Sequence, residues 1–449
     1  MKHWYLSRSI TLRLAGFSAF YMAQGVPIGL FSIALPAWLV QQGADAADIA
    51  TLAAITGLPW GFKLIAGPFM DRFTFLPMGR RRPWVLGAQV GLTLSLLSLA
   101  LVDDPLGQFW TVVAIGFVIN TFAALQDVAV DGMAIDVLPE NERGRANAFM
   151  AFGQVIGFSG FGALDGALIV RYGLPVTVLV STLAVGLILL FATLVREREG
   201  EKLLPWTEGE PFHRQAQSEP SVGAMFRDLL RVLLLPMSLL LVGVEFLFRA
   251  SAGVTLSILP IFAVQELGYS AEQYAYWVGA LGAIGAFIGI FVGPAIDRFG
   301  VRPLAAAGLL GGGLLVIVFA LSRPLWGDTL VVIGTLGLLQ VLNQAVFIAM
   351  IASFMGICWA RVAATQFAIY MSLANLSRSV GAGLFALIAT QISTVHAMYL
   401  IAGLLLAGGL GIRFFNPAAH RARLADLDAV ADAVADVAAD ADAADVRGA

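Results

Sequence analysis

The sequence is poor in charge, cysteine and histidine. Only 13% of its 449 residues are charged, and it holds one cysteine, Cys358, and four histidines. The low charge excludes nucleic-acid binding and intrinsic disorder, and a single cysteine excludes an internal disulfide. Hydrophobic residues make up 59% of the chain and its mean hydropathy is +0.84. This composition indicates a lipid bilayer, rather than water, as the main solvent.

The sequence also lacks the motifs of common enzyme sites. It has no Cys/His cluster for a metal, no phosphate-binding GxxxxGK[ST] segment and no plausible Ser/His/Asp set. We therefore expect that the chain is not an enzyme and holds no metal or cofactor. Nothing in it provides a nucleotide domain for ATP-driven transport.

Apolar runs long enough to cross about 30 Å of hydrocarbon recur along the whole chain. Twelve spans are predicted, at residues 12–38, 46–70, 83–102, 108–134, 145–170, 174–195, 233–264, 272–296, 303–322, 328–355, 362–388 and 394–414. If the N-terminus is cytoplasmic, 22 of the 27 lysines and arginines lie on the cytoplasmic side. Positive charge collects on that side of membrane proteins, so both termini are expected in the cytoplasm. No cleavable signal peptide is expected, because the first span is too long.

Polar segments divide the chain into four parts. Residues 1–195 and 233–415 each hold six predicted spans, and residues 196–232 form a charged, proline-containing cytoplasmic linker. Residues 416–449 form an acidic tail rich in alanine and aspartate. This composition predicts a solvated, mobile tail, with a weak amphipathic helix as the alternative.

A short motif occurs once in each half, after the second and the eighth span. The first copy reads Gly67-Pro-Phe-Met-Asp71-Arg72 with Gly79-Arg80 after it, and the second reads Gly293-Pro-Ala-Ile-Asp297-Arg298 with Gly300 and Arg302 after it. An aspartate at a helix end can pair with arginine or cap a neighbouring helix. The duplication predicts two related six-helix halves, one of the internal-repeat plans of secondary transporters.

This G-x-x-x-D-R-x-G-R/K pattern resembles the signature loop of the major facilitator superfamily. The resemblance implies an all-α membrane protein with twelve transmembrane helices in two six-helix halves. It favours ion pairs that latch helix ends in one transport state and break in the other, with a static surface salt bridge as the alternative. The latch candidates are Gly67, Asp71, Arg72, Arg80, Asp136, Arg143, Gly293, Asp297, Arg298 and Arg302.

A second resemblance narrows the family. The fourth span contains Gln126-Asp127-Val-Ala-Val-Asp131, and matching segments elsewhere are Tyr21-Met-Ala-Gln24-Gly25-Val-Pro27 and Pro59-Trp60-Gly-Phe62-Lys63. These segments resemble the AmpG muropeptide permeases and the related acetyl-CoA transporters. Met133 departs from the pattern, since the family often has tryptophan there. The resemblance implies proton-driven import of anhydromuropeptides.

Ionisable residues within spans are candidates for function, because each costs roughly 2.5–3.5 kcal/mol on insertion. Asp127 and Asp131 are four residues apart on one helix face, so one can hold a proton near neutral pH; Asp131 can instead cap or pair near the surface. Glu245 and Arg249 are also four apart, and either neutralise each other or carry a proton and bind an anion. The proton-coupling candidates are Asp127, Asp131 and Glu245.

Cations and amides within the spans are the candidates for solute binding. Lysine and arginine hold acidic groups, and amides suit a sugar- or peptide-bearing solute, although each amide can instead join two helices and Arg378 can extend toward an interface. The candidates are Gln24, Lys63, Gln126, Arg249, Gln340, Asn343, Gln344, Gln366, Asn375 and Arg378.

These observations predict a monomeric, proton-driven transporter of a polar, anionic small molecule in the inner membrane of a bacterium. Anhydromuropeptides are the solute that the resemblance implies. A siderophore, acetyl-CoA or another organic anion is the alternative within transport, although the phosphates of CoA demand more cations than Lys63, Arg249 and Arg378. A membrane assembly factor of the same fold, which carries no flux, is the alternative from another class.

Overall fold

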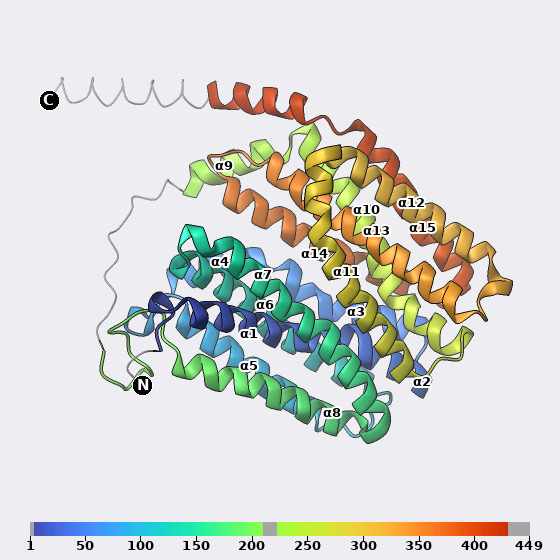
Figure 1. Cartoon of the computed structure of the whole chain (residues 1–449), viewed down its shortest axis with the longest axis horizontal. Helices are drawn as coiled ribbons and strands as arrows, with labels where there is room; N and C mark the ends of the chain where they lie inside the picture. Colours follow the sequence, from blue (N-terminus) through green and yellow to red (C-terminus); the bar gives the residue numbers. More distant parts are fainter. Residues whose placement is uncertain (1–3, 210–221, 430–449) are drawn as a thin grey trace.

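The computed structural model describes residues 4–209 and 222–429, which fold into long helices packed side by side (Figure 1). The first half comprises α1 (Ile10–Gly29), η2 (Leu30–Ala34), α2 (Leu35–Gln42), α3 (Ala46–Gly61), α4 (Lys63–Arg72), α5 (Arg82–Leu99), α6 (Phe109–Val137), α7 (Arg143–Val155), η5 (Ile156–Gly160) and α8 (Phe161–Leu194). The second half comprises α10 (Pro236–Ile261), η6 (Phe262–Glu266), α11 (Ala271–Phe299), α12 (Val301–Leu321), α13 (Thr329–Gly356), α14 (Ala363–Ala386) and α15 (Thr394–Gly411). Helix α9 (Val222–Leu233) precedes α10, and the short turns are η1 (Leu6–Arg8), η3 (Leu76–Met78), η4 (Glu140–Glu142), η7 (Arg323–Leu325) and η8 (Ile412–Phe414).

Within the described residues, nine helical segments are long and apolar enough to cross a membrane. One of them, Arg143–Leu194, has 52 residues, about 78 Å at 1.5 Å per residue. Gly173 interrupts it with a φ of 81°, a conformation that favours glycine, so this segment makes two crossings. Helices α5 and α14 supply the two other predicted spans. The protein is therefore a multi-pass, all-α membrane protein with twelve spans in two sets of six, as the sequence predicts.

The bundle has two ends. Trp4, residues 195–209 and α9 lie at one end, which we name the linker face, and the loops at 43–45, 267–270 and 388–393 lie at the other, which we name the far face (Figure 1). At the far face, side chains cap the helices that begin there. Asp45 caps α3 and Ser270 caps α11, each in a reciprocal capping box that satisfies free backbone N–H groups.

The two halves meet along α3 and α14, and again along α8 and α11. A Cβ at Gly57 would lie 2.4 Å from Ser379 Oγ, and one at Gly61 would lie 3.0 Å from Leu376 Cβ, so α3 touches α14 over these turns. Further toward the linker face, a Cβ at Gly67 in α4 would have nothing within 4 Å. Helix α14 therefore packs closely on α3 near the middle of the bundle, and α4, which follows α3, lies open toward the linker face.

Helix α11 shows the same divergence. Near its start Arg171 of α8 donates to Glu272 at 2.5 Å, and a Cβ at Gly279 would lie 2.7 Å from the Ser159 carbonyl oxygen in η5. At Gly293, near the linker face, a Cβ would have nothing within 4 Å. Small residues allow the close approach at the far face, and the halves are splayed at the linker face.

The acidic tail is partly ordered. Residues 417–429 are helical and pack on the loop between α13 and α14. His420 is buried with its Nε2 2.9 Å from the carbonyl oxygen of Ile357, and Trp359 Nε1 donates to Asp428 at 2.7 Å. The expectation of a mobile tail is thus wrong for this part, because Leu424 and Leu427 supply an apolar face that composition alone does not reveal. Residues 430–449, with the three valines Val430, Val434 and Val437, lie outside the described residues.

Glu197 organises the loop that leads into α5. Its side chain is fully buried, and its carboxylate accepts backbone N–H groups from Arg80 at 3.3 Å, Arg81 at 2.9 Å and Arg82 at 2.6 Å. Gly79 has a φ of 99°, and a Cβ there would lie 2.9 Å from Glu197 Cδ. Burial raises the pKa of this carboxyl, and the backbone donors act against that shift. The carboxylate thus supplies the anion that the N-terminus of α5 favours.

Replacing Glu197 with alanine should lower the free energy of unfolding by roughly 3 kcal/mol, because three backbone donors lose a charged partner. Thermal unfolding of the purified protein in detergent measures the loss. Glu199→Ala is the matched control, since Glu199 is half-exposed and pairs with Arg8 at the surface. Equal destabilisation by the two variants would contradict the role given to Glu197.

Candidate functional site

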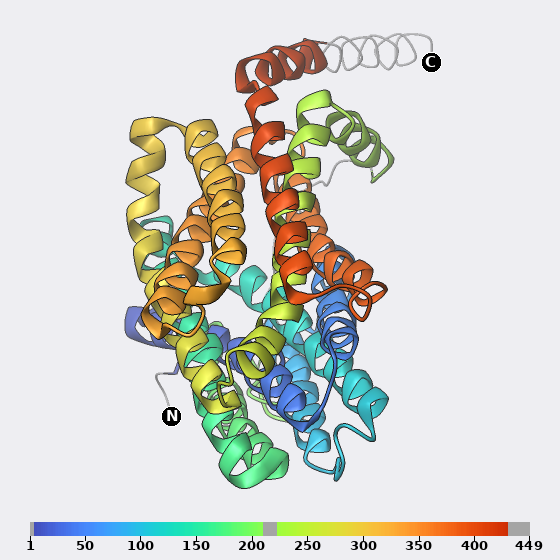
Figure 2. The same cartoon turned by 90° about the vertical axis from the view of Figure 1, so that its right-hand side faces the viewer.

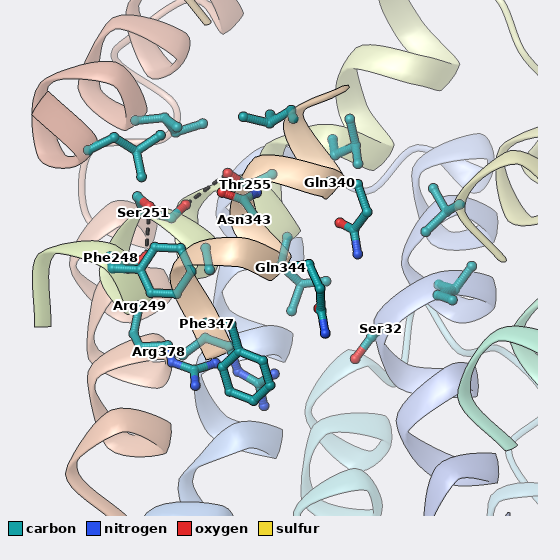
Figure 3. Close-up of a pocket in the computed structure, with 18 of the residues that line it drawn as sticks. Ser32, Phe248, Arg249, Ser251, Thr255, Gln340, Asn343, Gln344, Phe347 and Arg378 are labelled. Carbon is teal, nitrogen blue, oxygen red and sulfur yellow. Dashed lines mark hydrogen bonds between the residues drawn. The ribbon is translucent and has the colours of Figure 1, made fainter. Parts of the chain in front are cut away.

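A cavity of about 370 Å³ lies between the two halves near the middle of the bundle. The first half contributes Ser32 and Ile33 of η2 and Phe158 of η5. The second half contributes most of the lining, from α10, α11, α13, α14 and α15 (Figure 3). The π-helical turns η2 and η5 place their residues at this junction, which agrees with the frequent use of such turns at functional sites.

Two arginines enter the cavity from neighbouring helices of the second half. Arg249 donates from Nε to Glu245 Oε1 at 2.7 Å, and its guanidinium lies 4.7 Å from the centre of the Phe347 ring. Arg378 of α14 lies close enough to Arg249 for the two charges to repel. In Figure 3 both guanidinium groups gather around Phe347. Arg378 has no ion-pair or hydrogen-bond partner among the described residues.

Three amides cover another wall of the same cavity. Gln340, Asn343 and Gln344 lie on one face of α13, as their spacing predicts. Gln340 and Gln344 fit against glycines of α11, where a Cβ at Gly285 or Gly289 would come within 3.0 Å of an amide side-chain atom. Figure 3 shows both amides projecting toward the first half, on the side where Ser32 lies.

A second polar cluster lies within the first half. Lys63, the first residue of α4, forms an ion pair with Asp127 of α6, whose side chain is only 7% exposed. One turn nearer the linker face, the exposed Asp131 accepts a hydrogen bond from the Tyr21 hydroxyl of α1. Each of the two carboxylates therefore has a partner on another helix.

Trp60 connects this cluster with the cavity. The Lys63 ammonium lies 4.9 Å from the centre of the Trp60 ring, and Trp60 Nε1 donates to Asn120 Oδ1 at 2.9 Å. Trp60 and Asn120 line a pocket of about 20 Å³, room for about one water molecule, that also contains Arg378 and Ser32. The helix breaks between α3 and α4 at Phe62, directly beside these contacts. Asn375 of α14 donates to the Trp60 carbonyl oxygen at 3.5 Å.

The other predicted solute ligands lie elsewhere. Gln24 and Gln126 are fully buried within the first half, and Gln126 donates to the Phe20 carbonyl oxygen at 2.9 Å. Gln366 accepts from the Trp359 backbone N–H at 2.7 Å and donates to Tyr370, so it holds the loop before α14. None of these three lines the cavity between the halves among the described residues. Helix–helix and loop contacts account for Gln126 and Gln366.

Several polar residues at this depth were not predicted. Asp165 of α8 is fully buried, and one carboxyl oxygen accepts from Ser181 at 2.8 Å while the other has no partner among the described residues. The rule that singles out charged residues within spans would have found it. Tyr21 and Trp60 stand in the segments that resemble a known family, but only their neighbours in space give them a place in the site.

The ion pairs and hydrogen bonds described for the latch candidates lie within one half. Asp136 at the end of α6 lies 3.7 Å from Arg80 and 3.9 Å from Arg81, and Arg302 donates to the Phe415 carbonyl oxygen at 3.4 Å. Arg72, Arg143 and Asp297 are exposed and have no ion pair among the described side chains, and Gly67 and Gly293 face open space. Arg298 lies over its neighbour Phe299. The side chain of Asp71 is outside the described part, and the latch stays a prediction.

Curated relatives match parts of the chain. An anhydromuropeptide permease of Escherichia coli is 32% identical over 157 residues, 35% of this chain and 30% of that protein. A putative transporter AmpG 4 of Rickettsia felis is 27% identical over 186 residues, 40% of this chain and 44% of that protein. An uncharacterized protein of Haemophilus influenzae is 37% identical over 125 residues, 27% of this chain and 28% of that protein. The chain thus spans less than half the length of each of these relatives.

Solved structures match the whole fold. The crystal structure of a D-xylose–proton symporter has a TM-score of 0.64 at 15% identity, covering 90% of this chain and 97% of that one. A bacterial homologue of the human lysosomal transporter Spinster, in an inward-facing and unoccupied conformation, also has a TM-score of 0.64, at 14% identity, and covers 91% and 95%. The family model of the Major Facilitator Superfamily matches residues 15–382 and again 241–432. The chain therefore belongs to the Major Facilitator Superfamily and is a secondary transporter rather than an enzyme.

Proposed function

We propose that this transporter moves a polar solute that carries a carboxylate, and that protons drive the movement. The observation that carries the proposal is Arg378, a cation without a described partner in a cavity between the two halves. Glu245 offsets the charge of Arg249, so the described side chains of the cavity carry one net positive charge. An uncompensated charge away from water is costly, and a bound carboxylate relieves that cost.

The amides of α13 define the rest of the solute. Gln340, Asn343 and Gln344 each offer both donors and acceptors, which suits hydroxyl and amide groups of a sugar or peptide. Phe347 and Trp60 offer aromatic faces near the arginines. Carboxylates beside sugar hydroxyl and amide groups are the chemistry of an anhydromuropeptide, and the partial similarity to a permease of that solute supports this choice.

The distribution of cations disfavours acetyl-CoA. Lys63 pairs with Asp127 in the first half, and Arg249 pairs with Glu245. Among the described cations of the two polar clusters, Arg378 alone is left to hold an anionic group, and a molecule with several phosphates needs more. Siderophores and other organic anions with one carboxylate remain the alternative solutes.

Asp127 is the proposed proton carrier. When charged, it holds Lys63 in place at the start of α4, and protonation removes that attraction. Asp131 lies one turn nearer the linker face and is exposed, so it provides a route for the proton. The freed Lys63 changes its contact with Trp60, which borders the pocket containing Arg378. Protonation of Asp127 thus acts on Trp60 through Lys63, and solute binding acts on Trp60 through the pocket that contains Arg378.

The orientation of the bundle follows from its charge. The linker face carries most lysines and arginines of the connections, so we place it, with both termini, in the cytoplasm of a bacterium. The splayed linker face then corresponds to a state open to the cytoplasm. The two halves of the chain enclose the cavity together, and we propose that the chain acts as a monomer.

Uptake of labelled anhydromuropeptide tests this function. The host is a bacterium that lacks its own permease and expresses this chain, with protein levels in the membrane measured in parallel. We expect uptake that a proton uncoupler abolishes. A membrane-inserted protein that gives no uptake would exclude muropeptides and favour another carboxylate-bearing solute.

Trp60→Ala should weaken the coupling of solute uptake to the proton gradient, while exchange of solute across the membrane continues. The substitution removes the ring between Lys63 and the pocket that contains Arg378. The ratio of uptake with a proton gradient to uptake without one should fall severalfold, in line with about 0.5–2 kcal/mol for the cation–π contact. Trp60→Phe keeps a ring and should retain most of the ratio. An unchanged ratio in Trp60→Ala, in a variant that unfolds at the wild-type temperature, would contradict the link.

A further inference from the structure

Helix α9 lies outside the transport site, at the linker face and at the edge of the second half (Figure 2). It contains the sequence Val-Gly-Ala-Met-Phe-Arg-Asp-Leu-Leu-Arg-Val-Leu and leads through Leu234 and Leu235 into α10. Nothing in the proposed transport mechanism uses it. Its side chains nevertheless divide into three faces of different chemistry.

The first face packs against the protein. Leu229 and Val232 are 6% and 0% exposed, and they form a cluster with Trp359 and Val362 of the loop between α13 and α14. Leu424 of the 417–429 helix joins the same cluster. This face holds α9 against the linker face and fixes its rotation about its own axis.

The second face is apolar and exposed. Phe226 is 68% exposed, Leu230 is 50% exposed and Leu234 is 59% exposed, and these residues are four positions apart. They form one stripe along the helix, because side chains at i and i+4 lie above one another. The chain then turns at Leu235 into α10, a helix that crosses the membrane and whose Leu239 is also exposed. The stripe therefore ends next to a helix that crosses the membrane.

The third face is charged. Arg227 and Arg231 are exposed and also four positions apart, on the side of the stripe away from Leu229. Arg231 lies 3.6 Å from Asp228, and Arg227 has no ion-pair partner among the described residues. A helix with an apolar side, a basic side and its remaining side on the protein matches an interfacial helix at the edge of a membrane protein.

We propose that α9 lies in the headgroup layer of the leaflet at the linker face, with the Phe226–Leu230–Leu234 stripe among the acyl chains. Arg227 and Arg231 then contact the phosphates of acidic phospholipids. The occupant is the bilayer itself, because the stripe ends two residues before a membrane-spanning helix and the charges beside it are positive. This inference goes beyond the transport function and does not depend on the solute.

Spin labels report the depth of each face. In a Cys358→Ser background, which keeps a hydrogen-bond donor for the Phe354 carbonyl oxygen, single cysteines replace Phe226, Leu230 or Arg227 and carry a nitroxide. The proteins are reconstituted in phosphatidylcholine vesicles with and without phosphatidylglycerol. Labels at 226 and 230 should collide mainly with oxygen, at a depth of about 5–10 Å in the headgroup and acyl boundary. The label at 227 should collide mainly with a water-soluble nickel complex.

Two results would overturn the proposed position of the stripe, and a third would overturn the role of the arginines. Equal access of the nickel complex to positions 226, 230 and 227 would show that the stripe faces water. Spectral broadening at 226 and 230 that grows with the protein-to-lipid ratio would show a second copy of the chain as the occupant. Phosphatidylglycerol should deepen the labels at 226 and 230, and the Arg227→Gln/Arg231→Gln double substitution should remove that dependence. A lipid effect that survives the double substitution would refute the role of the arginines.

Discussion

Arg378→Ala should raise the half-saturating concentration of an anionic solute by about 10–150-fold. Removing a charged hydrogen bond costs roughly 1.5–3 kcal/mol, and about 1.4 kcal/mol corresponds to a factor of ten. The effect should be large because Arg249 cannot replace Arg378, since Glu245 occupies it at 2.7 Å. Concentration-dependent uptake of labelled anhydromuropeptide into cells or proteoliposomes measures the change.

Two variants make the result specific to the cavity. Arg378→Lys keeps the charge but loses the two-pronged geometry of the guanidinium, so it should show an intermediate loss. Arg323→Ala is the matched control, because Arg323 is 68% exposed and lies 3.6 Å from Glu266, outside the cavity. Wild-type affinity in Arg378→Ala would remove the central support for an anionic solute.

Asp127→Asn should abolish concentrative uptake and leave exchange of solute across the membrane intact. Asparagine cannot lose or gain the proton, so the transport cycle no longer responds to a proton gradient. One pH unit of gradient is worth a factor of ten in accumulation per coupled proton, and this factor should disappear. Accumulation under an imposed gradient, compared with counterflow in its absence, separates the two activities.

The asparagine variant also leaves Lys63 without its partner, which is a cost in itself. The double variant Asp127→Asn/Lys63→Gln removes both charges and should restore stability without restoring accumulation. Asp131→Asn should retain accumulation at a lower rate, because it changes the exposed end of the proposed proton route. Full accumulation in Asp127→Asn would place the proton elsewhere, and the buried Asp165 would become the next candidate.

Regular spacing made much of the second half predictable. Glu245 and Arg249 are four apart on one helix, and Gln340, Asn343 and Gln344 occupy one face, so the structure needs only local helix geometry to bring each set together. The twelve spans follow in the same way from long apolar runs. Arg378 was predictable because a charged side chain within a span is costly and usually has a function.

The first half was less predictable because its key contacts join distant helices. The spacing of Asp127 and Asp131 predicts that the two carboxylates repel each other, but it does not reveal that Lys63 pairs with the first and that Tyr21 donates to the second. The role of Trp60 depends on a helix break at Phe62 and on α14 of the other half. No pattern within a single segment encodes such pairings. Gln366 lies within a predicted span, yet its hydrogen bonds hold the loop before α14.

The ion pair between Arg171 and Glu272 makes the balance between inward-open and outward-open molecules sensitive to ionic strength. These residues join the two halves at the far face, and the Arg171 side chain is 59% exposed. Dissolved salt screens an exposed pair of this kind, and such a pair contributes about 0–1 kcal/mol. A change from dilute to saline surroundings can therefore shift the balance between inward-open and outward-open molecules by up to about fivefold. The external ionic strength would then regulate transport without any dedicated regulatory site.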